Sequence, residues 1–374
     1  MNPPDNQNHL LAEPDSRCYY FGKSSATCPS VGEAVLLTDL PAHKAAFSRI
    51  GLAIFVLTMA YQGSAVVLSL LFTALAPAAT ETWWYSWLLT DLSLYGVGLP
   101  CMWLVIRQVP KAPYNQAYRV RSGGNAYKPR FGLGTWLVIA VIGAGVMQIG
   151  GLIGNGVMEG LSRLVGYDYA NGLESMVGET PLWMTFLGTV VIAPFGEELL
   201  FRKLLIDRTR RWGDGVSILL SGILFGLFHG NLFQLFYTTL IGFLLAYVYT
   251  RSGSYWWCVG LHALVNFLGG ILPTLLQNWI GKEHFASDEA LTEHLLTNPV
   301  QYLVYTLYAL AIWVVMLAAV ILLLCLRKRV KLGGGADKLS RGHRFSTVML
   351  NAGMVLAFVA GLLILLINLI PLSA

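Results

Sequence analysis

Long runs of apolar residues, separated by short polar loops, dominate the chain from about residue 50 onward. A membrane-crossing helix needs about 20 such residues, so the pattern predicts about nine transmembrane helices. They are predicted over residues 50–77, 83–106, 133–158, 181–206, 216–230, 233–250, 255–277, 301–326 and 347–370. The fifth and sixth runs are short and nearly continuous, so we expect a tight hairpin, or a broken or tilted helix, at this point. Because only helices and closed barrels can span a bilayer, the predicted fold is an all-α, polytopic integral membrane helical bundle.

The composition agrees with this fold class. Of 374 residues, 55% are hydrophobic and only 12% are charged, whereas soluble domains carry about 25% charged residues. The first 48 residues are polar and lack the pattern of a signal peptide, so we expect a flexible cytoplasmic tail there. The predicted regions are a tail (1–48), N-terminal membrane helices (49–180), core helices (181–277) and a C-terminal loop with further helices (278–374).

Basic residues indicate the orientation of the helices. They precede the first apolar run and follow the second, fourth, sixth and eighth, whereas acidic residues gather in the alternate loops. Since positively charged loops stay in the cytoplasm, we expect a multi-pass protein of the cell membrane with its N-terminus in the cytoplasm and its C-terminus outside. The net charge of +5 then reflects topology, and no nucleic-acid partner is expected. Tryptophans at the start of the second run, Trp83, Trp84 and Trp87, are interpreted as interfacial anchors.

Two glutamates and an arginine interrupt the fourth apolar run, in the stretch GEELLFR at residues 196–202. Each charge at the centre of a bilayer costs about 2.5–3.5 kcal/mol. Glu198 and Arg202 are four residues apart on one helical face and can pair. Glu197 points about 100° away from Glu198 and has no cation on its own helix. A purely structural role for both glutamates is therefore hard to defend.

Three more polar side chains lie in other predicted helices. His229 ends the fifth run, and His262 and Asn266 share one face of the seventh. At 1.5 Å per residue, Glu197, His229 and His262 lie roughly 16, 20 and 12 Å from the cytoplasmic ends of their helices. A single intramembrane histidine is as often a helix-packing residue as a functional one, but similar depth in three helices favours a shared site. Asp91, in the second run, is interpreted either as a supporting partner of this site or as a locally paired residue.

This set of side chains suits hydrolysis. A carboxylate and an imidazole can together activate a water molecule, and a second imidazole and a carboxamide can donate hydrogen bonds to an oxyanion. Such chemistry requires no cofactor. Alternatively, Glu197, His229 and His262 could bind zinc or another divalent metal, although the HExxH motif is absent. Cys258 lies one turn before His262, but its neighbouring tryptophans favour a buried packing role over that of a nucleophile.

The motifs resemble those of the CPBP family of intramembrane proteases. This family includes CAAX prenyl endopeptidases of the Ras-converting type and bacterial proteins linked to bacteriocin immunity. The resemblance rests on EExxxR at 197–202, FxxxH at 225–229 and HxxxN at 262–266, and covers about residues 181–270. It implies that residues 181–277 are the catalytic core of an endopeptidase that cleaves membrane-associated or lipidated peptides or proteins. It leaves the need for a metal open.

The resemblance also implies a role for each motif residue. Glu197 corresponds to the glutamate that activates water, with His229 assisting. His262 and Asn266 correspond to the pair that holds the oxyanion, and Glu198 and Arg202 to supporting residues. We expect a water-filled cavity between the fourth, fifth and seventh helices, open to the cytoplasm.

Two other functions fit the same residues. In a proton-coupled membrane transporter, Glu197, His229 and Asp91 would form a proton relay, although the chain shows no repeat of the transporter kind. In a non-catalytic membrane scaffold or immunity protein, the motif residues would be dispensable.

Overall fold

The computed structural model describes residues 40–112, 131–330 and 332–370, without 336, 338, 340 and 341. These residues form helices joined by short connections, and no strand occurs among them. The N-terminal helices are α2 (Leu40–Leu75), α3 (Pro77–Thr80), α4 (Trp83–Asp91), η2 (Leu92–Gly98), α5 (Leu99–Ile106), α7 (Leu133–Val165) and α8 (Gly172–Glu179). The central helices are α9 (Leu182–Phe186), η3 (Leu187–Ile192), α10 (Ala193–Glu198), η4 (Leu199–Ile206), α11 (Asp207–Thr209), η5 (Arg210–Trp212), α12 (Asp214–Phe228) and α13 (Leu232–Ser252). The remaining helices are α14 (Tyr255–Asn266), η6 (Phe267–Ile271), α15 (Leu272–Ile280), η7 (Lys282–Ala286), α16 (Asp288–Thr297), α17 (Pro299–Leu326), α18 (Arg344–Val348) and α19 (Ala352–Ile367).

The chain is a polytopic helical membrane protein, as the apolar pattern predicted. Within the described residues, seven helices are long and apolar enough to cross a membrane. They cover Leu40–Leu75, Trp83–Ile106, Leu133–Val165, Leu182–Trp212, Leu232–Ser252, Tyr255–Ile280 and Pro299–Leu326. The fifth and ninth predicted spans coincide with two shorter apolar helices, α12 and α19. The count of nine spans therefore stays a prediction.

Two helices extend beyond the predicted apolar runs. Helix α2 begins at Leu40, with Pro41 in its first turn, where proline is well tolerated. Residues 40–48 are thus helical and not part of a flexible tail, and the remainder of the predicted tail lies outside the described residues. Helix α7 continues to Val165, and Glu159 and Arg163 pair at 2.8 Å on its exposed last turns. It ends where Gly166 adopts a left-handed conformation, φ +70°.

The predicted hairpin of the fifth and sixth spans is confirmed as α12 and α13. The two helices meet at glycines, since a Cβ added at Gly242 would lie 2.9 Å from Gly222 Cα. Gly230 makes the turn with φ +63°, and the Asn231 side chain caps α13 by accepting a hydrogen bond from Gln234 N at 3.2 Å. The turn places His229 at the end of α12 and not within a longer helix.

Four segments are π-helical: η2, η3, η4 and η6. Three of them end two residues before a proline, at Pro100, Pro194 and Pro273. Proline lacks an N–H and its ring clashes with the carbonyl four residues earlier, so a widened turn before it lets the helix continue. Segment η4 contains no proline and starts directly after Glu198. Single π turns recur at functional sites, which makes η4 the exception of interest.

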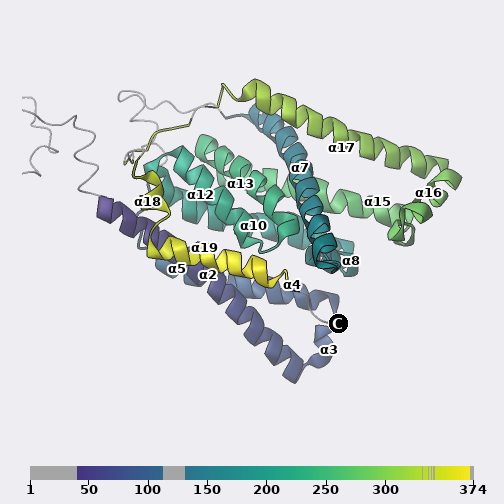
Figure 1. The fold of residues 1–374 in the computed structure, drawn as a ribbon, viewed down its shortest axis with the longest axis horizontal. Helices are drawn as coiled ribbons and strands as arrows, with labels where there is room; N and C mark the ends of the chain where they lie inside the picture. Colours follow the sequence, from purple (N-terminus) through teal and green to yellow (C-terminus); the bar gives the residue numbers. More distant parts are fainter. Residues whose placement is uncertain are drawn as a thin grey trace, which may run out of the picture.

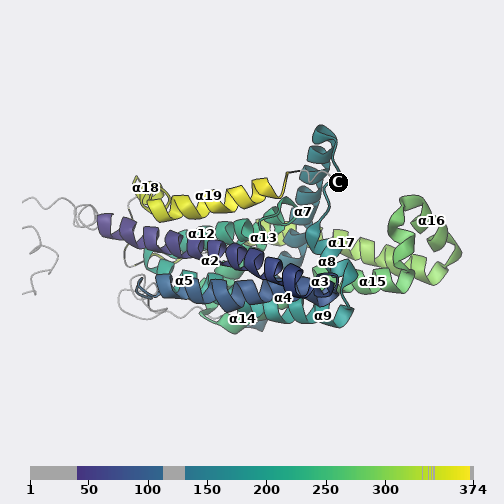
Figure 2. The same ribbon diagram turned by 90° about the horizontal axis from the view of Figure 1, so that it is seen from below.

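The fourth span runs through the middle of the bundle. Figure 1 shows α10, α12 and α13 in the middle of the bundle, with α2 and α19 along one side and α17 on the opposite side. Figure 2, seen from below, shows α2 and α19 running alongside each other. One buried cluster joins Leu200, Phe201 and Leu205 of η4 to residues of α2, α5, α12 and α19. A second cluster joins Ile206 to α7, α13 and α14. The charged residues of the fourth span are therefore held between two apolar cores.

Trp87 does not act as an interfacial anchor. It is 6% exposed, its Nε1 donates a 3.0 Å hydrogen bond to Thr180 Oγ1, and its ring packs on the backbone of Gly188. The missing side chain at Gly188 creates the space for this ring, which hydropathy alone does not reveal. Trp83 and Trp84 are each 36% exposed at the start of the helix, as expected for anchors.

Glycines on one face of α7 allow close contact with α13. A Cβ added at Gly150 would lie 2.5 Å from Tyr237 Cα, whereas one added at Gly151 would meet nothing within 4 Å. We expect Gly150→Val to destabilise the protein by about 1–3 kcal/mol through overpacking, and Gly151→Val to change little. Thermal unfolding of the two purified variants checks this; equal melting temperatures would show that the α7–α13 contact is not tight.

Candidate active site

Glu198 is held by two partners inside the protein. Its Oε2 lies 3.0 Å from Arg202 Nε, and its Oε1 lies 2.9 Å from His262 Nδ1. The side chains of Glu198 and Arg202 are fully buried. The pairing that the four-residue spacing predicted is therefore confirmed, and a third partner comes from α14.

Arg202 completes its contacts with an aromatic ring. Its Nε and the Glu198 carboxylate form an ion pair that lacks the alignment of a hydrogen bond, and its Nη atoms make no hydrogen bond with the described residues. The guanidinium lies 4.8 Å from the centre of the Phe225 ring, a favourable contact for a desolvated cation. Phe225 is the first residue of the FxxxH motif, so this contact links two of the three motifs.

Glu197 faces the same histidine from the other side. Its Oε2 lies 3.8 Å from His262 Nε2, and its side chain is 12% exposed. That oxygen is buried and has no hydrogen-bond partner among the described residues. An imidazole from α14 thus faces Glu197, and His262 stands between the two glutamates.

His229 packs on Phe225 and forms no hydrogen bond or ion pair with Glu197 among the described residues. Its Nδ1 is 2.8 Å from Phe225 O. Because a carbonyl only accepts hydrogen bonds, Nδ1 carries the proton, which leaves the Nε2 of a neutral His229 as an acceptor. The Phe225 ring centre is 4.9 Å from that of His229 and 5.7 Å from that of His262. The two imidazoles therefore flank one aromatic ring.

Asn266 lies one turn after His262, at the end of α14. Its Nδ2 donates a 2.8 Å hydrogen bond to Thr189 O in η3. A carboxamide nitrogen carries two hydrogens, so one remains for another acceptor. The contact also ties α14 to the segment that precedes the two glutamates.

Residues that no motif indicated surround the glutamates. The Tyr95 ring packs on the backbone of Gly196, which has no Cβ in its way, and Tyr255 Oη donates a 2.5 Å hydrogen bond to Phe195 O. Asp91 and Tyr95 both lie within electrostatic range of Glu197. Asp91, which belongs to the second span, thus lies near the candidate site. In the sequence, only Gly196 before the glutamate pair hints at the Tyr95 contact, because a residue without a side chain leaves room for a ring.

The donor set named for a metal is not gathered into one group. Among residues 40–370, wherever the structure describes them, no three histidine, cysteine or carboxylate side chains are grouped to hold an ion. His262 Nδ1 bonds Glu198 and His229 Nδ1 bonds its own helix, so Nε2 is the atom of each ring left for a ligand bond, as in many metal-binding histidines. The metal alternative on Glu197, His229 and His262 therefore stays a prediction.

Cys258 has the buried packing role that its sequence position favoured. It is fully buried, and its Sγ lies 3.5 Å from Leu245 O and 3.6 Å from Ser254 O. A thiol without solvent access is a poor nucleophile.

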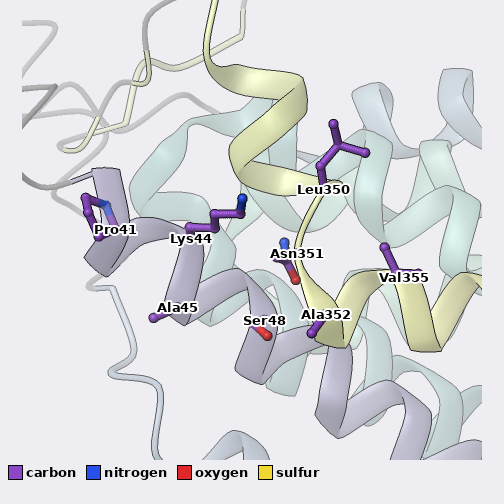
Figure 3. A pocket seen from close by; sticks show the side chains of 8 residues that line it. All are labelled: Pro41, Lys44, Ala45, Ser48, Leu350, Asn351, Ala352 and Val355. Carbon is purple, nitrogen blue, oxygen red and sulfur yellow. The ribbon is translucent and has the colours of Figure 1, made fainter.

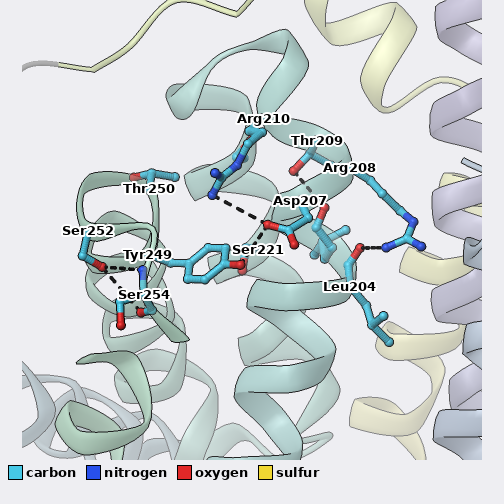
Figure 4. Close-up of polar contacts among 12 residues, drawn as sticks. Leu204, Asp207, Arg208, Thr209, Arg210, Ser221, Tyr249, Thr250, Ser252 and Ser254 are labelled. Carbon is cyan, nitrogen blue, oxygen red and sulfur yellow. Dashed lines mark hydrogen bonds and ion pairs between the residues drawn. The ribbon is translucent and has the colours of Figure 1, made fainter. Parts of the chain in front are cut away.

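The fourth span ends in a second polar centre, shown in Figure 4. Asp207 Oδ1 accepts a 2.8 Å hydrogen bond from Tyr249 Oη and lies 3.8 Å from Arg210 Nη2. Arg208 donates to Ile106 O at 2.7 Å and to Leu204 O at 2.9 Å. These arginines, which the sequence places in a cytoplasmic loop, are buried as anchors that fix the end of the span carrying the glutamates to its neighbours.

Comparison with known proteins supports the resemblance. Residues 179–268 match the family described as type II CAAX prenyl endopeptidase Rce1-like. The chain is 28% identical over 109 residues to the UPF0177 protein YxdF of Lactococcus lactis subsp. lactis (strain IL1403), covering 29% of this chain and 60% of that protein. It is 31% identical over 80 residues to the "Putative membrane peptidase YdiL" of Bacillus subtilis (strain 168), covering 20% of this chain and 32% of that protein. No solved structure matches the chain.

The matched segment contains all six residues singled out by the motifs. The match of residues 179–268 to the Rce1-like family of CAAX prenyl endopeptidases agrees with the resemblance found from the motifs. The matches cover less than two thirds of either relative. At the level of the family, the comparisons support an intramembrane protease segment within a multi-span membrane protein.

Proposed function

We propose that this chain, built around an Rce1-like segment, is an intramembrane endopeptidase in which Glu197 activates water to cleave a peptide bond. The observation that carries the proposal is the placement of His262 between two glutamates of the fourth span. Glu198 is bound to His262 and Arg202, whereas Glu197 keeps an unbonded oxygen that faces His262. One glutamate is thus occupied as a support, and the other is available for chemistry.

The spacing between Glu197 and His262 suits a water molecule. At 3.8 Å the two atoms are too far apart for a direct hydrogen bond, and a contact of this length is commonly bridged by water. A water bound there would donate a hydrogen to the Glu197 carboxylate. Glu197 is the strongest candidate base because its oxygen has no competing partner among the described residues.

The reaction then follows in two steps. The water loses a proton to Glu197 as its oxygen forms a bond to the carbonyl carbon of the substrate, which gives a tetrahedral oxyanion. The C–N bond breaks when the Glu197 carboxylic acid returns the proton to the leaving nitrogen. The products are a carboxylic acid and an amine, which exchange a proton to give a carboxylate and an ammonium group, and no covalent intermediate with the protein forms. His229, with Nε2 as an acceptor, assists in the proton transfer.

Asn266 and His262 are the proposed donors to the oxyanion. Asn266 keeps one amide hydrogen after its bond to Thr189 O. His262, when protonated, donates from Nδ1 to Glu198 and has Nε2 left for the site. Donors fixed in advance by such contacts stabilise the developing charge without reorganisation. Glu198 and Arg202 act through His262 and are positioning residues.

We propose that the reaction needs no metal cofactor. Purified protein in proteoliposomes should cleave membrane-anchored reporter peptides after exhaustive treatment with a strong chelator. Activity that disappears with the chelator and returns with stoichiometric zinc or cobalt would contradict the proposal.

The substrate is proposed to be a membrane-associated or lipidated peptide or protein, because the glutamates lie in a helix embedded in the bilayer. The proposed cavity opens to the cytoplasm between the spans that carry Glu197, His229 and His262. The biological setting is proposed to be the cell membrane, with the N-terminus of the chain in the cytoplasm.

The proposed orientation can be tested by cysteine labelling in intact cells. In a variant without native cysteines, an impermeant thiol reagent should modify Glu289→Cys, in the predicted outer loop, and spare Lys111→Cys, in a predicted cytoplasmic loop. Both side chains are exposed in the folded protein. Reversed labelling would invert the orientation and place the cavity on the outer side.

A proton-coupled transporter is the second candidate, because Asp91 lies within electrostatic range of Glu197. Such a protein would move protons or a solute across a sealed vesicle and release no peptide fragment. The reporter-peptide assay therefore separates the two functions.

A further inference from the structure

An open pocket of about 630 Å³ lies where the beginning of α2 meets the beginning of α19. Figure 3 shows its lining: Pro41, Lys44 and Ser48 from α2 face Asn351 and Val355 from the α19 side. Both helices enter their apolar stretches just beyond this point. The pocket therefore lies at the level where the membrane meets water, far along the chain from the motif residues.

The pocket offers donors to an anion. Lys44 is exposed and has no hydrogen bond or ion pair with any residue that the structure describes. Ser48, one turn later on the same face, accepts a 3.1 Å hydrogen bond from Gly353 N, and its own hydroxyl hydrogen is left for another partner. Asn351 is saturated, because its amide donates to Thr347 O and Val348 O and its oxygen accepts from Met354 N. Asn351 thus lines the pocket without a free donor, whereas Lys44 and Ser48 have donors available to a ligand.

The charge on the described residues of α2, α18 and α19 has one sign. Helix α2 carries Lys44 and Arg49, and α18 begins with Arg344, whereas α2, α18 and α19 contain no acidic residue. An anion is therefore the complementary ligand. A pocket of this volume has the size of a small-molecule site and matches a lipid headgroup better than a protein domain.

Apolar stripes lead away from the pocket along both helices. On α19, Val355, Val359 and Leu362 recur at helical spacing and are 46%, 46% and 50% exposed. On α2, Leu52 and Met59 are 38% and 41% exposed. An occupant with a charged head in the pocket could lay acyl chains along these stripes. A free anion has no acyl chains and would make no contact with these exposed apolar residues.

We propose that this pocket binds the headgroup of an anionic phospholipid, with the phosphate on Lys44 and Ser48 and the acyl chains along α19 and α2. A lysine near a membrane surface contributes about 1 kcal/mol to attraction of anionic lipid, which corresponds to about a fivefold change in affinity. The site is independent of the proposed peptidase activity.

Native mass spectrometry of the purified full-length chain tests the proposal, with phosphatidylglycerol and phosphatidylcholine of identical acyl chains as probes. The wild-type protein should retain phosphatidylglycerol preferentially, and Lys44→Gln should reduce that binding about fivefold. Lys328→Gln is the matched control, an exposed lysine after α17 and outside the pocket, and should keep the preference. Ala45→Leu, which fills the pocket without changing charge, should lose it.

Three results would overturn the proposal. Equal retention of the two lipids by the wild-type protein would show non-specific annular lipid only. An unchanged preference in Lys44→Gln or Ala45→Leu would place the lipid elsewhere. Displacement of bound phosphatidylglycerol by millimolar glycerol phosphate, without acyl chains, would identify a free-anion site; failure of glycerol phosphate to compete supports the lipid.

Discussion

Glu197→Gln is expected to remove essentially all peptide hydrolysis while leaving the protein folded. Glutamine has nearly the shape of glutamate but cannot take a proton from water, and the Glu197 side chain has no hydrogen bond at Oε2 to lose. Activity should be measured on membrane-anchored peptides in proteoliposomes, with thermal unfolding as the check on folding. Wild-type stability with no turnover is the predicted combination.

Asn266→Ala is the comparison for Glu197→Gln, because it should lower the rate of peptide hydrolysis without abolishing it. Removal of one oxyanion donor lowers turnover by about 10²–10³, so residual hydrolysis should remain measurable. If Glu197→Gln retained as much activity as Asn266→Ala, Glu197 would not be the general base.

Arg202→Met is expected to cost the protein about 3–5 kcal/mol of stability, because it removes the arginine beside a fully buried Glu198 and leaves that carboxylate with only its hydrogen bond to His262. The measurement is the yield of monodisperse protein and its melting temperature. Arg163→Met removes an ion pair with the same four-residue spacing, but that pair is exposed, with 78% and 62% side-chain exposure. It should therefore change little.

The double variant Glu198→Gln/Arg202→Met separates charge from packing. Because the double variant has no buried carboxylate at position 198, it should recover a large part of the stability that Arg202→Met loses. If it is as unstable as Arg202→Met alone, then the Arg202 side chain acts through packing on Phe225 and not through its charge. Turnover should stay low in the double variant, since His262 loses the Glu198 carboxylate that fixes it.

The helices and the candidate residues could be predicted because they depend on short-range patterns. The run at 83–106 matches the helix Trp83–Ile106 at both ends, since hydropathy falls sharply there. The Glu198–Arg202 pair follows from helical spacing alone. The similar depth predicted for Glu197, His229 and His262 rests on the rise per residue alone and stays a prediction.

Contacts between helices could not be predicted in this way. The position of His262 between Glu197 and Glu198 depends on how α14 is rotated against α10. That rotation is set by contacts such as Asn266 with Thr189 O. The π-helical segments add to the problem, because each widened turn shifts the faces of the residues that follow. The pattern of apolar residues does not show where such turns occur without a proline, as in η4.

The most direct test of the proposed endopeptidase is a comparison of membrane proteomes from cells with the wild-type chain and with Glu197→Gln. In the variant, at least one membrane protein should accumulate uncleaved, and its fragment should disappear. Cells that carry Glu289→Cys, a change in the predicted outer loop and away from the proposed site, should match the wild type. Identical proteomes in wild-type and Glu197→Gln cells that express the chain would contradict the proposed peptidase and favour a non-catalytic membrane protein.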